Sequence, residues 1–311
     1  MDWRLKALSQ LVFSFVPRGE QLNYFAQRCF THSLPVSDNS FAVTVGYARK
    51  HIDAIQQYGQ RPLDRAVFYE FGTGWDLTIP FAYYGFGVNH QILVDICNLI
   101  RIAIVNDTIA KCQKMAAKLS IDRIPGARLN SEKYGFRHAL KQQYGIDYRA
   151  PCNASQTGLP SQSVDYITST STLEHIAPAE IRSILRECRR ILRDDGLMSV
   201  LIDYDDHYAY FDYRISAYNH LQFSDRTWRV FSPPLHYQNR LRHRDFVELF
   251  QSEGFRVVED RHSAVTESDL RTIKQMSLNK RFQSYSDADL AVHNGHLVLR
   301  KYLFAHIDSM R

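Results

Sequence analysis

The stretch YEFGTGWDL, residues 69–77, decides the fold of this 311-residue chain. Apolar residues lead into it as they do in a short buried strand, and a helical pattern follows it, so we expect a turn between a strand and a helix. Gly72 and Gly74 lack the β-carbons that would keep a ligand away from the backbone. The pattern therefore predicts a small molecule bound against this turn.

The flanking residues narrow the choice of ligand. A dinucleotide site would need a third glycine where this chain has Leu77, and a phosphate loop would need a lysine followed by serine or threonine. Glu70 suits a ligand with a cationic group, and Asp95, at the end of the next predicted strand, suits a ribose diol. S-Adenosylmethionine carries both groups, so it is the predicted ligand.

Short apolar strands alternate with helices around this turn, a pattern typical of βαβ units. The predicted fold class is α/β, with a doubly wound, seven-stranded, mostly parallel sheet and a ligand site at the carboxyl ends of its strands. The last two strands are expected to form an antiparallel closing pair. The predicted strands are residues 66–71, 91–96, 145–150, 164–169, 197–203, 254–260 and 296–304, and the predicted helices are residues 76–87, 107–119, 136–144, 178–192 and 243–253.

Residues 65–204 resemble the class I S-adenosylmethionine-dependent methyltransferases. EFGTGW (70–75) stands for the glycine motif of that family and Asp95 for its acidic residue after the second strand. APCNASQTGLPSQSVDYITSTSTLEHI (150–176) is similar to the stretch in which an Asp-Ala pair meets adenine, although this chain has Asn153 in place of the aspartate. LRECRRILRDDGLMSVLID (185–203) resembles the following helix, glycine turn and fifth strand, with Gly196 expected to end the helix.

The resemblance implies a Rossmann-like methyltransferase fold, an enzyme that uses S-adenosylmethionine, and S-adenosylhomocysteine as its product. The tail that includes NRLRHRDFVELFQSEGF (239–255) resembles bacterial members that modify sugars in surface polysaccharides. The expected reaction is therefore O-methylation of a hydroxyl on a small molecule or a cell-surface saccharide. The residues expected to bind the cofactor are Glu70, Gly72, Thr73, Gly74, Asp95, Ile96, Asn153, Ala154 and Ser171.

Acidic and histidine side chains follow the fifth predicted strand in DYDDHYAYFD, residues 203–212. His207 is the predicted general base, oriented by Asp206 or Asp205, and His175, beside Glu174, is a further catalytic candidate. The alternative is that these residues cap a helix. A divalent metal is a third possibility, but its ligands must converge from separate segments and a local run does not show that, so no metal is predicted.

The predicted domains are a helical N-terminal extension, residues 1–60, and a methyltransferase domain, residues 61–311. Within the second, residues 203–241 and 261–290 are expected to be insertions that form a substrate cap. Five apolar residues near the N-terminus are expected on one face of a short helix, packed on the body or lying on a membrane surface as a peripheral contact. These residues are Trp3, Leu8, Leu11, Val12 and Phe15.

Composition favours a cytoplasmic protein. The net charge is +5, but basic and acidic residues are interspersed, so no nucleic-acid partner is predicted. The five cysteines are odd in number and far apart, which argues against a disulfide framework and a zinc site. Neither a signal peptide nor a membrane span is expected. The sequence leaves the oligomeric state open.

Two other functions compete with catalysis on a small molecule. One is an inactive cofactor-binding scaffold that pairs with another protein, and the retained glycines and acidic residues of the turn region argue against it. The other is an RNA methyltransferase, suggested only by the pI of about 8.9. SPPLHY (232–237) superficially resembles the motif of amino-group methylation, but it follows the fifth strand instead of the fourth and is predicted to be a turn.

Overall fold

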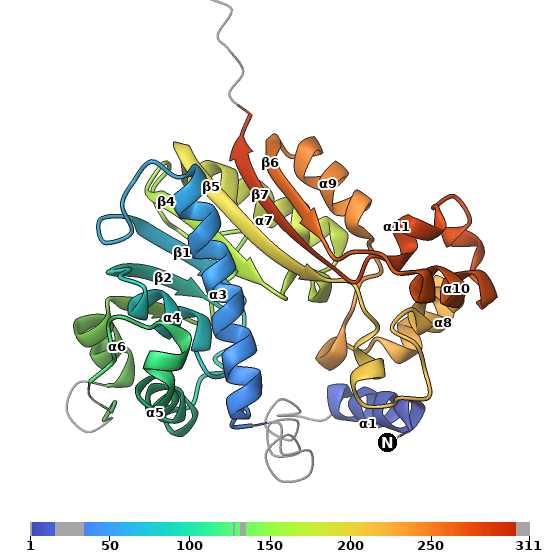
Figure 1. Ribbon diagram of the computed structural model, residues 1–311, viewed down its shortest axis with the longest axis horizontal. Coiled ribbons are helices and arrows are strands. Elements are labelled where there is room, and N and C mark those ends of the chain that lie inside the picture. The colour runs from blue at the N-terminus through green and yellow to red at the C-terminus, as the bar shows by residue number, and fades with distance from the viewer. Residues whose placement is uncertain (1, 16–33, 127, 131–134, 303–311) are drawn as a thin grey trace, which may run out of the picture.

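A seven-stranded sheet forms the centre of the computed structural model, which describes residues 2–15, 34–126, 128–130 and 135–302 (Figure 1). The strand order is β3-β2-β1-β4-β5-β7-β6. Neighbouring strands are parallel, except that β7 is antiparallel to β5 and to β6. The predicted fold class and the antiparallel closing pair are thus confirmed. The strands are β1 (Val67–Phe71), β2 (His90–Val94), β3 (Ile146–Arg149), β4 (Val164–Thr170), β5 (Leu192–Asp203), β6 (Phe255–His262) and β7 (Asn294–Lys301).

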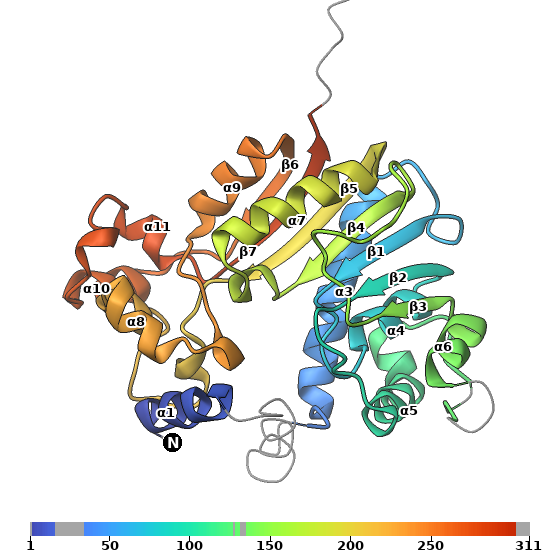
Figure 2. The same ribbon diagram turned by 180° about the vertical axis from the view of Figure 1, so that it is seen from behind.

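Helices cover both faces of the sheet, as the front and back views show (Figures 1 and 2). Apolar side chains of α3, α4, α5 and α6 pack on one face, and those of α7 and α9 pack on the other. The central strands β1 and β4 are buried almost throughout because both of their faces are covered. The helices flanking the sheet are α3 (Asp38–Tyr58), α4 (Thr78–Gly85), α5 (Ile102–Leu119), α6 (Phe136–Tyr144), α7 (Pro178–Ile191) and α9 (His243–Ser252).

Gly196 does not end a helix, which corrects the sequence prediction. Helix α7 ends at Ile191, and Gly196 lies within β5. A β-carbon at this position would lie 2.7 Å from the carbonyl oxygen of Asp165 on the neighbouring strand. The glycine is needed for the close approach of β5 to β4, at an irregularity in their pairing, and not for a left-handed helix end.

The two predicted insertions pack together beside the carboxyl edge of the sheet, and we call residues 204–241 and 263–293 the cap. Tyr218 and Leu221 of the first insertion share an apolar cluster with Ile273, Phe282 and Leu290 of the second. The cap elements are η2 (His207–Tyr210), η3 (Asn219–Gln222), α8 (Asp225–Phe231), η4 (Pro234–His236), α10 (Glu267–Gln275), η5 (Lys280–Phe282) and α11 (Asp287–Ala291).

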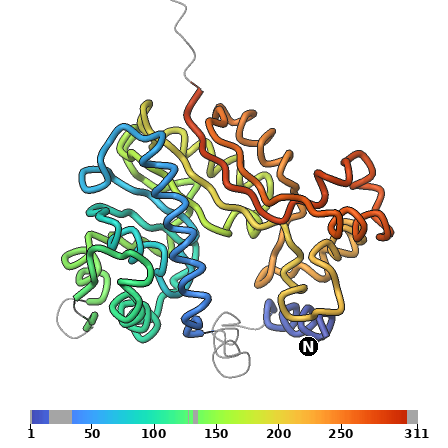
Figure 3. Tube along the Cα trace, viewed as in Figure 1, coloured from blue at the N-terminus to red at the C-terminus, as the bar shows by residue number. Residues whose placement is uncertain are grey.

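The N-terminal helix α1 (Trp3–Phe15) packs on the cap and is separated from α3 in space (Figure 3). The Trp3 ring lies 4.8 Å from that of Phe231 and 5.5 Å from that of Tyr208, measured between centroids. The predicted apolar face is only partly right, since Trp3 is buried while Leu8, Val12 and Phe15 are exposed. The predicted boundary at residue 60 stays a prediction.

Among the described residues, no helix combines the length and the apolar character that crossing a bilayer requires.

Candidate functional site

A first cavity of about 750 Å³ opens where β1, β2 and β4 end. The carboxyl ends of parallel strands meet at one edge of a sheet, so the turns that follow these strands form its walls. Trp75, Thr172, His175 and Glu180 also line it. The residues predicted to bind a cofactor that line this cavity are Gly72, Gly74, Asp95, Ile96, Asn153, Ala154 and Ser171.

The two glycines of the turn differ in what surrounds them. Both have positive φ angles, +76° at Gly72 and +67° at Gly74, where other residues are strained. A β-carbon at Gly72 would lie 2.2 Å from the side chain of Thr172, whereas one at Gly74 would meet nothing within 4 Å. Gly72 is thus required by the packing of the turn, and Gly74 opens space at the cavity wall.

Asp95 and Asn153 face the first cavity from turns that their own side chains stabilise. The Oδ1 of Asp95 accepts a hydrogen bond from the backbone N–H of Cys97 at 3.0 Å. The Oδ1 of Asn153 accepts hydrogen bonds from the N–H and the hydroxyl of Ser155, both at 2.9 Å. The amide oxygen of Asn153 is therefore committed to its turn.

Glu70 and Thr73 do not line the first cavity, although both were predicted to bind the cofactor. Glu70 is only 2% exposed and accepts a hydrogen bond from the Thr168 hydroxyl on β4. Burial raises the pKa of Glu70 to about 8. In this structure Glu70 therefore bridges β1 and β4, and its predicted pairing with a cation stays a prediction.

A second cavity, of about 780 Å³, lies between the cap, α1 and the start of α7. His175 and Glu180 line both cavities, so the two meet at these residues. The lining of the second cavity combines aromatic, charged and amide groups. These include Phe15, Asp225, Trp228, Tyr237, Gln238, Asn239, Arg240 and Arg281.

Three side chains converge beside this meeting point, and we call Glu174, His175 and His207 the junction cluster. Of the three, only His175 lines the cavities, and Glu174 and His207 lie behind it. Glu174 and His175 lie in η1 (Leu173–His175), directly after β4, and His207 begins η2 after β5. One carboxylate oxygen and one ring nitrogen of each histidine lie within 4.8 Å of one another. The predicted catalytic residues His175 and His207 are thus brought together, with ring centroids 4.9 Å apart.

Glu174 is the least expected member of the cluster. Its side chain is buried, at 2% exposure, and neither carboxylate oxygen has a hydrogen-bond partner among the described residues. Burial raises the pKa of Glu174 well above its usual range, and the nearby charge of Asp203 adds to the effect. Buried carboxyl groups without partners are rare because their desolvation is not compensated.

Asp203 and Tyr210 lie beside His207. The Oδ2 of Asp203 is 3.3 Å from the Nε2 of His207 and accepts a hydrogen bond from the Tyr210 hydroxyl at 2.5 Å. Burial opposes ionisation of Asp203, but these contacts hold its pKa below the usual range. The Tyr210 ring stacks on that of His207, with centroids 5.4 Å apart. The acidic neighbour of His207 is therefore Asp203.

Asp206 does not orient His207, which corrects the sequence prediction. Its carboxylate is fully buried, accepts hydrogen bonds from the Tyr208 N–H and the Asn219 side chain, and is the N-cap of η2. Burial raises the pKa of Asp206 to about 6. The helix-capping alternative is thus the one that the structure supports for this residue.

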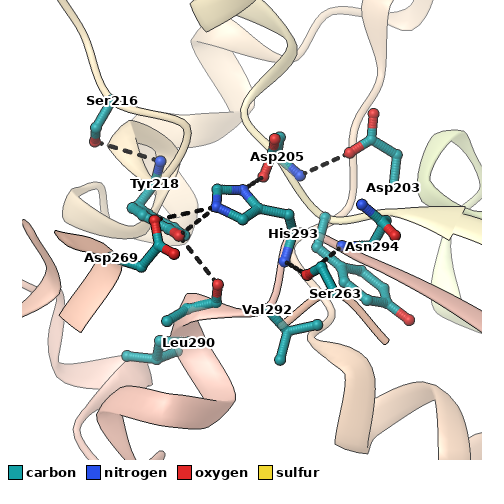
Figure 4. A network of polar contacts seen from close by, with 12 residues as sticks. Asp203, Asp205, Ser216, Tyr218, Ser263, Asp269, Leu290, Val292, His293 and Asn294 are labelled. Carbon is teal, nitrogen blue, oxygen red and sulfur yellow. Dashed lines mark hydrogen bonds and ion pairs between the residues drawn. The ribbon is translucent and has the colours of Figure 1, made fainter. Parts of the chain in front are cut away.

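The partner of Asp205 is His293 instead of the predicted His207 (Figure 4). The Nδ1 of His293 is 2.6 Å from Asp205, and its Nε2 is 3.2 Å from Asp269 in α10 and 2.8 Å from the Tyr218 hydroxyl. The hydrogen bond with Asp205 raises the pKa of His293 above its usual value. This network ties both insertions of the cap to the end of β5.

Residues 237–239 form hydrogen bonds with the η1 segment, which carries Glu174 and His175, and with His207. This role was not predicted from the sequence. The Nδ1–H of His175 donates to the Tyr237 carbonyl at 2.8 Å. The side-chain amide of Asn239 donates to two carbonyls of the η1 segment, and its backbone N–H donates to the Glu174 carbonyl. The Gln238 side chain accepts from the His207 N–H. No sequence motif marks these residues, since they act through distant partners.

A known protein family matches the central part of this chain. Residues 85–200 match the family described as a methyltransferase domain. No curated protein matches the sequence. A Methanosarcina mazei structure described as a S-adenosylmethionine-dependent methyltransferase is 15% identical, with a TM-score of 0.43, over 81% of this chain and 98% of its own.

Two other solved structures are similar at comparable levels. A Burkholderia thailandensis 1,6-didemethyltoxoflavin-N1-methyltransferase is 11% identical, with a TM-score of 0.45, over 91% of this chain and 87% of its own. A Streptomyces coelicolor geranyl diphosphate C-methyltransferase is 12% identical, with a TM-score of 0.45, over 82% of this chain and 78% of its own.

Proposed function

We propose that this chain, which contains a class I S-adenosylmethionine-dependent methyltransferase domain, transfers the methyl group to a hydroxyl oxygen of a small polar acceptor. A saccharide is the acceptor class that we favour. Gly72 and Gly74 would place the methionine part of the cofactor, Asp95 its ribose, and Asn153 with Ala154 its adenine.

The observation that carries the proposal is the pair of cavities that meet at His175 and Glu180. Each has about the volume of a cofactor or a small oligosaccharide site. The first is lined by most of the predicted cofactor residues. With the cofactor in the first cavity and the acceptor in the second, the transferable methyl group would face the acceptor at the junction cluster.

The reaction needs alignment and removal of one proton. As the acceptor oxygen attacks the methyl carbon, the C–O bond forms, the C–S bond breaks and its electron pair stays on sulfur, which leaves a methyl ether and S-adenosylhomocysteine. Alignment of two bound reactants can supply several kcal/mol of barrier lowering, and a base contributes about 10²–10⁴-fold. His207 is the proposed base, because Asp203, 3.3 Å from its Nε2, can orient its ring.

The lining of the second cavity supports a saccharide acceptor. Trp228 and Tyr237 offer aromatic surface, while Gln238, Arg240 and Asp225 offer donors and acceptors for several hydroxyl groups. Sugars present apolar ring faces and many hydroxyls, so a site that binds them needs both kinds of group. A flat, uniformly basic surface would have favoured RNA instead.

The test is transfer of labelled methyl from S-adenosylmethionine to fractionated cell-envelope saccharides and to a panel of free sugars. We expect label in an alkali-stable ether, and its loss in His207→Asn. His90→Asn, at the amino end of β2 and remote from both cavities, is the matched control. Tight cofactor binding without label in any fraction would support the scaffold, and label in RNA alone would reject a saccharide acceptor.

A further inference from the structure

We propose that Glu174, His175 and His207 bind a divalent transition-metal ion beside the meeting point of the two cavities, which His175 lines. Binding of the ion is independent of the function proposed above, while its role toward the acceptor rests on that function. The proposal differs from the sequence-based expectation of no metal, which the local run of residues 203–207 could not decide.

The first argument is convergence from separate segments. Glu174 and His175 follow β4, and His207 follows the adjacent strand β5. Their ligand atoms lie within 4.8 Å of one another. Atoms bound to one zinc ion at about 2.0–2.2 Å lie about 3.4 Å apart in a tetrahedral site, so small side-chain rotations would complete the geometry.

The second argument is the unpartnered carboxyl of Glu174. Its two oxygens are buried, no side chain among the residues the structure describes donates a hydrogen bond to them, and only the backbone N–H groups of Glu174 and Asp203 lie near them. A buried acid in this state is stabilised either by a proton or by a cation. Asp203 adds a further negative charge beside His207, so the surroundings favour a cation.

The third argument is the orientation of His175. A backbone carbonyl only accepts, so the contact with Tyr237 places the proton of His175 on Nδ1 and leaves a lone pair on Nε2. Metal-binding histidines are commonly fixed by such a hydrogen bond from their other nitrogen. Asn239 fixes the η1 segment, and Gln238 fixes the backbone of His207, so both parts of the site are held in place.

The ligand set indicates which ions fit. Two imidazoles and one carboxylate suit Zn²⁺, Mn²⁺ or Fe²⁺, whereas Mg²⁺ and Ca²⁺ prefer oxygen ligands throughout. Three protein ligands leave an open position, as in catalytic zinc sites. His175 lines both cavities, so that position would be accessible to an acceptor hydroxyl beside the cofactor.

An ion at this position would sharpen the proposed mechanism. A divalent ion there would lower the pKa of an acceptor hydroxyl and ease loss of its proton to water, and His207 would act as a ligand instead of a free base. The oxygen would then attack the methyl carbon while the C–S bond breaks. The metal-free mechanism, with His207 as base, and the metal-assisted mechanism use the same cluster. Only the second predicts that methyl transfer stops when the ion is removed.

The test uses the full chain without a histidine tag, stripped with chelator and titrated with Zn²⁺ and Mn²⁺ by calorimetry. We expect one ion per chain. Glu174→Gln and His207→Asn should each weaken binding by more than the ~10–100-fold that loss of an outer-shell partner causes. The matched controls Glu248→Gln, on the exposed face of α9, and His90→Asn, on β2, should bind as the parent does.

Two further measurements make the result decisive. Circular dichroism and cofactor binding on the same samples show whether a variant has lost its fold, and X-ray absorption counts histidine ligands at the bound ion. Absence of stoichiometric binding, or equal affinity in Glu174→Gln, would overturn the metal site even if methyl transfer is observed. A bound ion in a chain without transfer activity would support the site and reject the proposed function.

Discussion

The two cavities differ in how far apart in the sequence their walls lie. The first is built mainly from turns that directly follow β1, β2, β3 and β4, and the start of α7 completes it. The second takes its walls from α1, α7 and the cap, including Leu11, Arg240 and Arg281. A site at strand ends is fixed by the sheet, whereas a site under a cap is fixed by how separate segments pack.

This difference has a chemical counterpart. Backbone atoms and small residues dominate the glycine turn of the first cavity, which suits a ligand shared by many enzymes. Buried and charged side chains lie beside the meeting point of the cavities, where Glu174, His207 and Asp203 gather around His175. We expect the first region to bind the cofactor and the second to determine the acceptor and the chemistry.

The largest expected effect is on the first cavity alone. Gly74→Leu should reduce cofactor affinity by about 4 kcal/mol, at least ~10³-fold, because its side chain enters space that the ligand needs. The positive φ angle adds about 1–2 kcal/mol of strain. Calorimetry with S-adenosylhomocysteine measures the affinity.

The matched control for that change is Gly87→Leu. Gly87 also has a positive φ angle, and a β-carbon added there would meet nothing within 4 Å, but it lies outside both cavities. It should lose stability without losing affinity. Equal loss of affinity in both variants would mean that strain, and not occupation of the cavity, is responsible.

Asp95→Asn should weaken cofactor binding next most strongly. Replacing a charged acceptor of ribose hydroxyls costs about 1.5–3 kcal/mol, on the order of 10–100-fold in affinity. The thermal midpoint should change little, since an amide oxygen can still accept from the Cys97 N–H. Asp122→Asn, at an exposed position, serves as the control, and unchanged affinity in Asp95→Asn would remove the ribose assignment.

Asn239→Ala should act on the second region without affecting the first. Loss of its amide leaves the Leu173 and Ile176 carbonyls without this donor and loosens the η1 segment. We expect kcat to fall by about tenfold with cofactor affinity unchanged, because small displacements at the reacting centre lower rates strongly. Steady-state kinetics and calorimetry on one preparation separate the two quantities.

Asn106→Ala is the corresponding control. The Asn106 side chain also makes two hydrogen bonds, both with the backbone of Leu129, but it lies on α5 away from the junction cluster. It should lower stability by about 1–3 kcal/mol and leave kcat near that of the parent. A similar loss of kcat in both variants would show general destabilisation instead of a positioning role for Asn239.

The smallest effect concerns how the cap is attached to the sheet. The pKa of His293 is raised in the folded protein, so its pairing with Asp205 and Asp269 stabilises the fold fully below about pH 6.5. That contribution is lost as the pH rises through the raised pKa. His293→Gln should therefore lower the free energy of unfolding by about 1 kcal/mol at pH 6 and by less at pH 9.

Urea unfolding of the parent and the variant across this range measures that difference. His90→Gln removes a histidine at the amino end of β2 without touching the cap and is the control. If the difference in free energy of unfolding between the parent and His293→Gln stays constant or grows as the pH rises, the charge of His293 does not stabilise the attachment of the cap.

The sequence by itself determined the sheet, the glycine turn and most of the first cavity. Strand periodicity and the residues that end each strand are local properties, and parallel strands bring their carboxyl ends to one edge. This is why the strand pattern assigns Gly72, Gly74 and Asp95 to a common site, to which the resemblance to methyltransferases added Asn153. Glu70 was the exception, because which face of β1 its side chain occupies depends on the packing of β4.

Only the tertiary structure decided the junction cluster. Three neighbouring aspartates at the end of the same strand, which the sequence does not distinguish, have three different partners. Asp203 contacts His207, Asp205 pairs with His293 and Asp206 caps η2. Burial likewise removed solvent from Glu174 and raised its pKa. Side-chain direction and desolvation depend on residues dozens or hundreds of positions away, so a local pattern does not contain them.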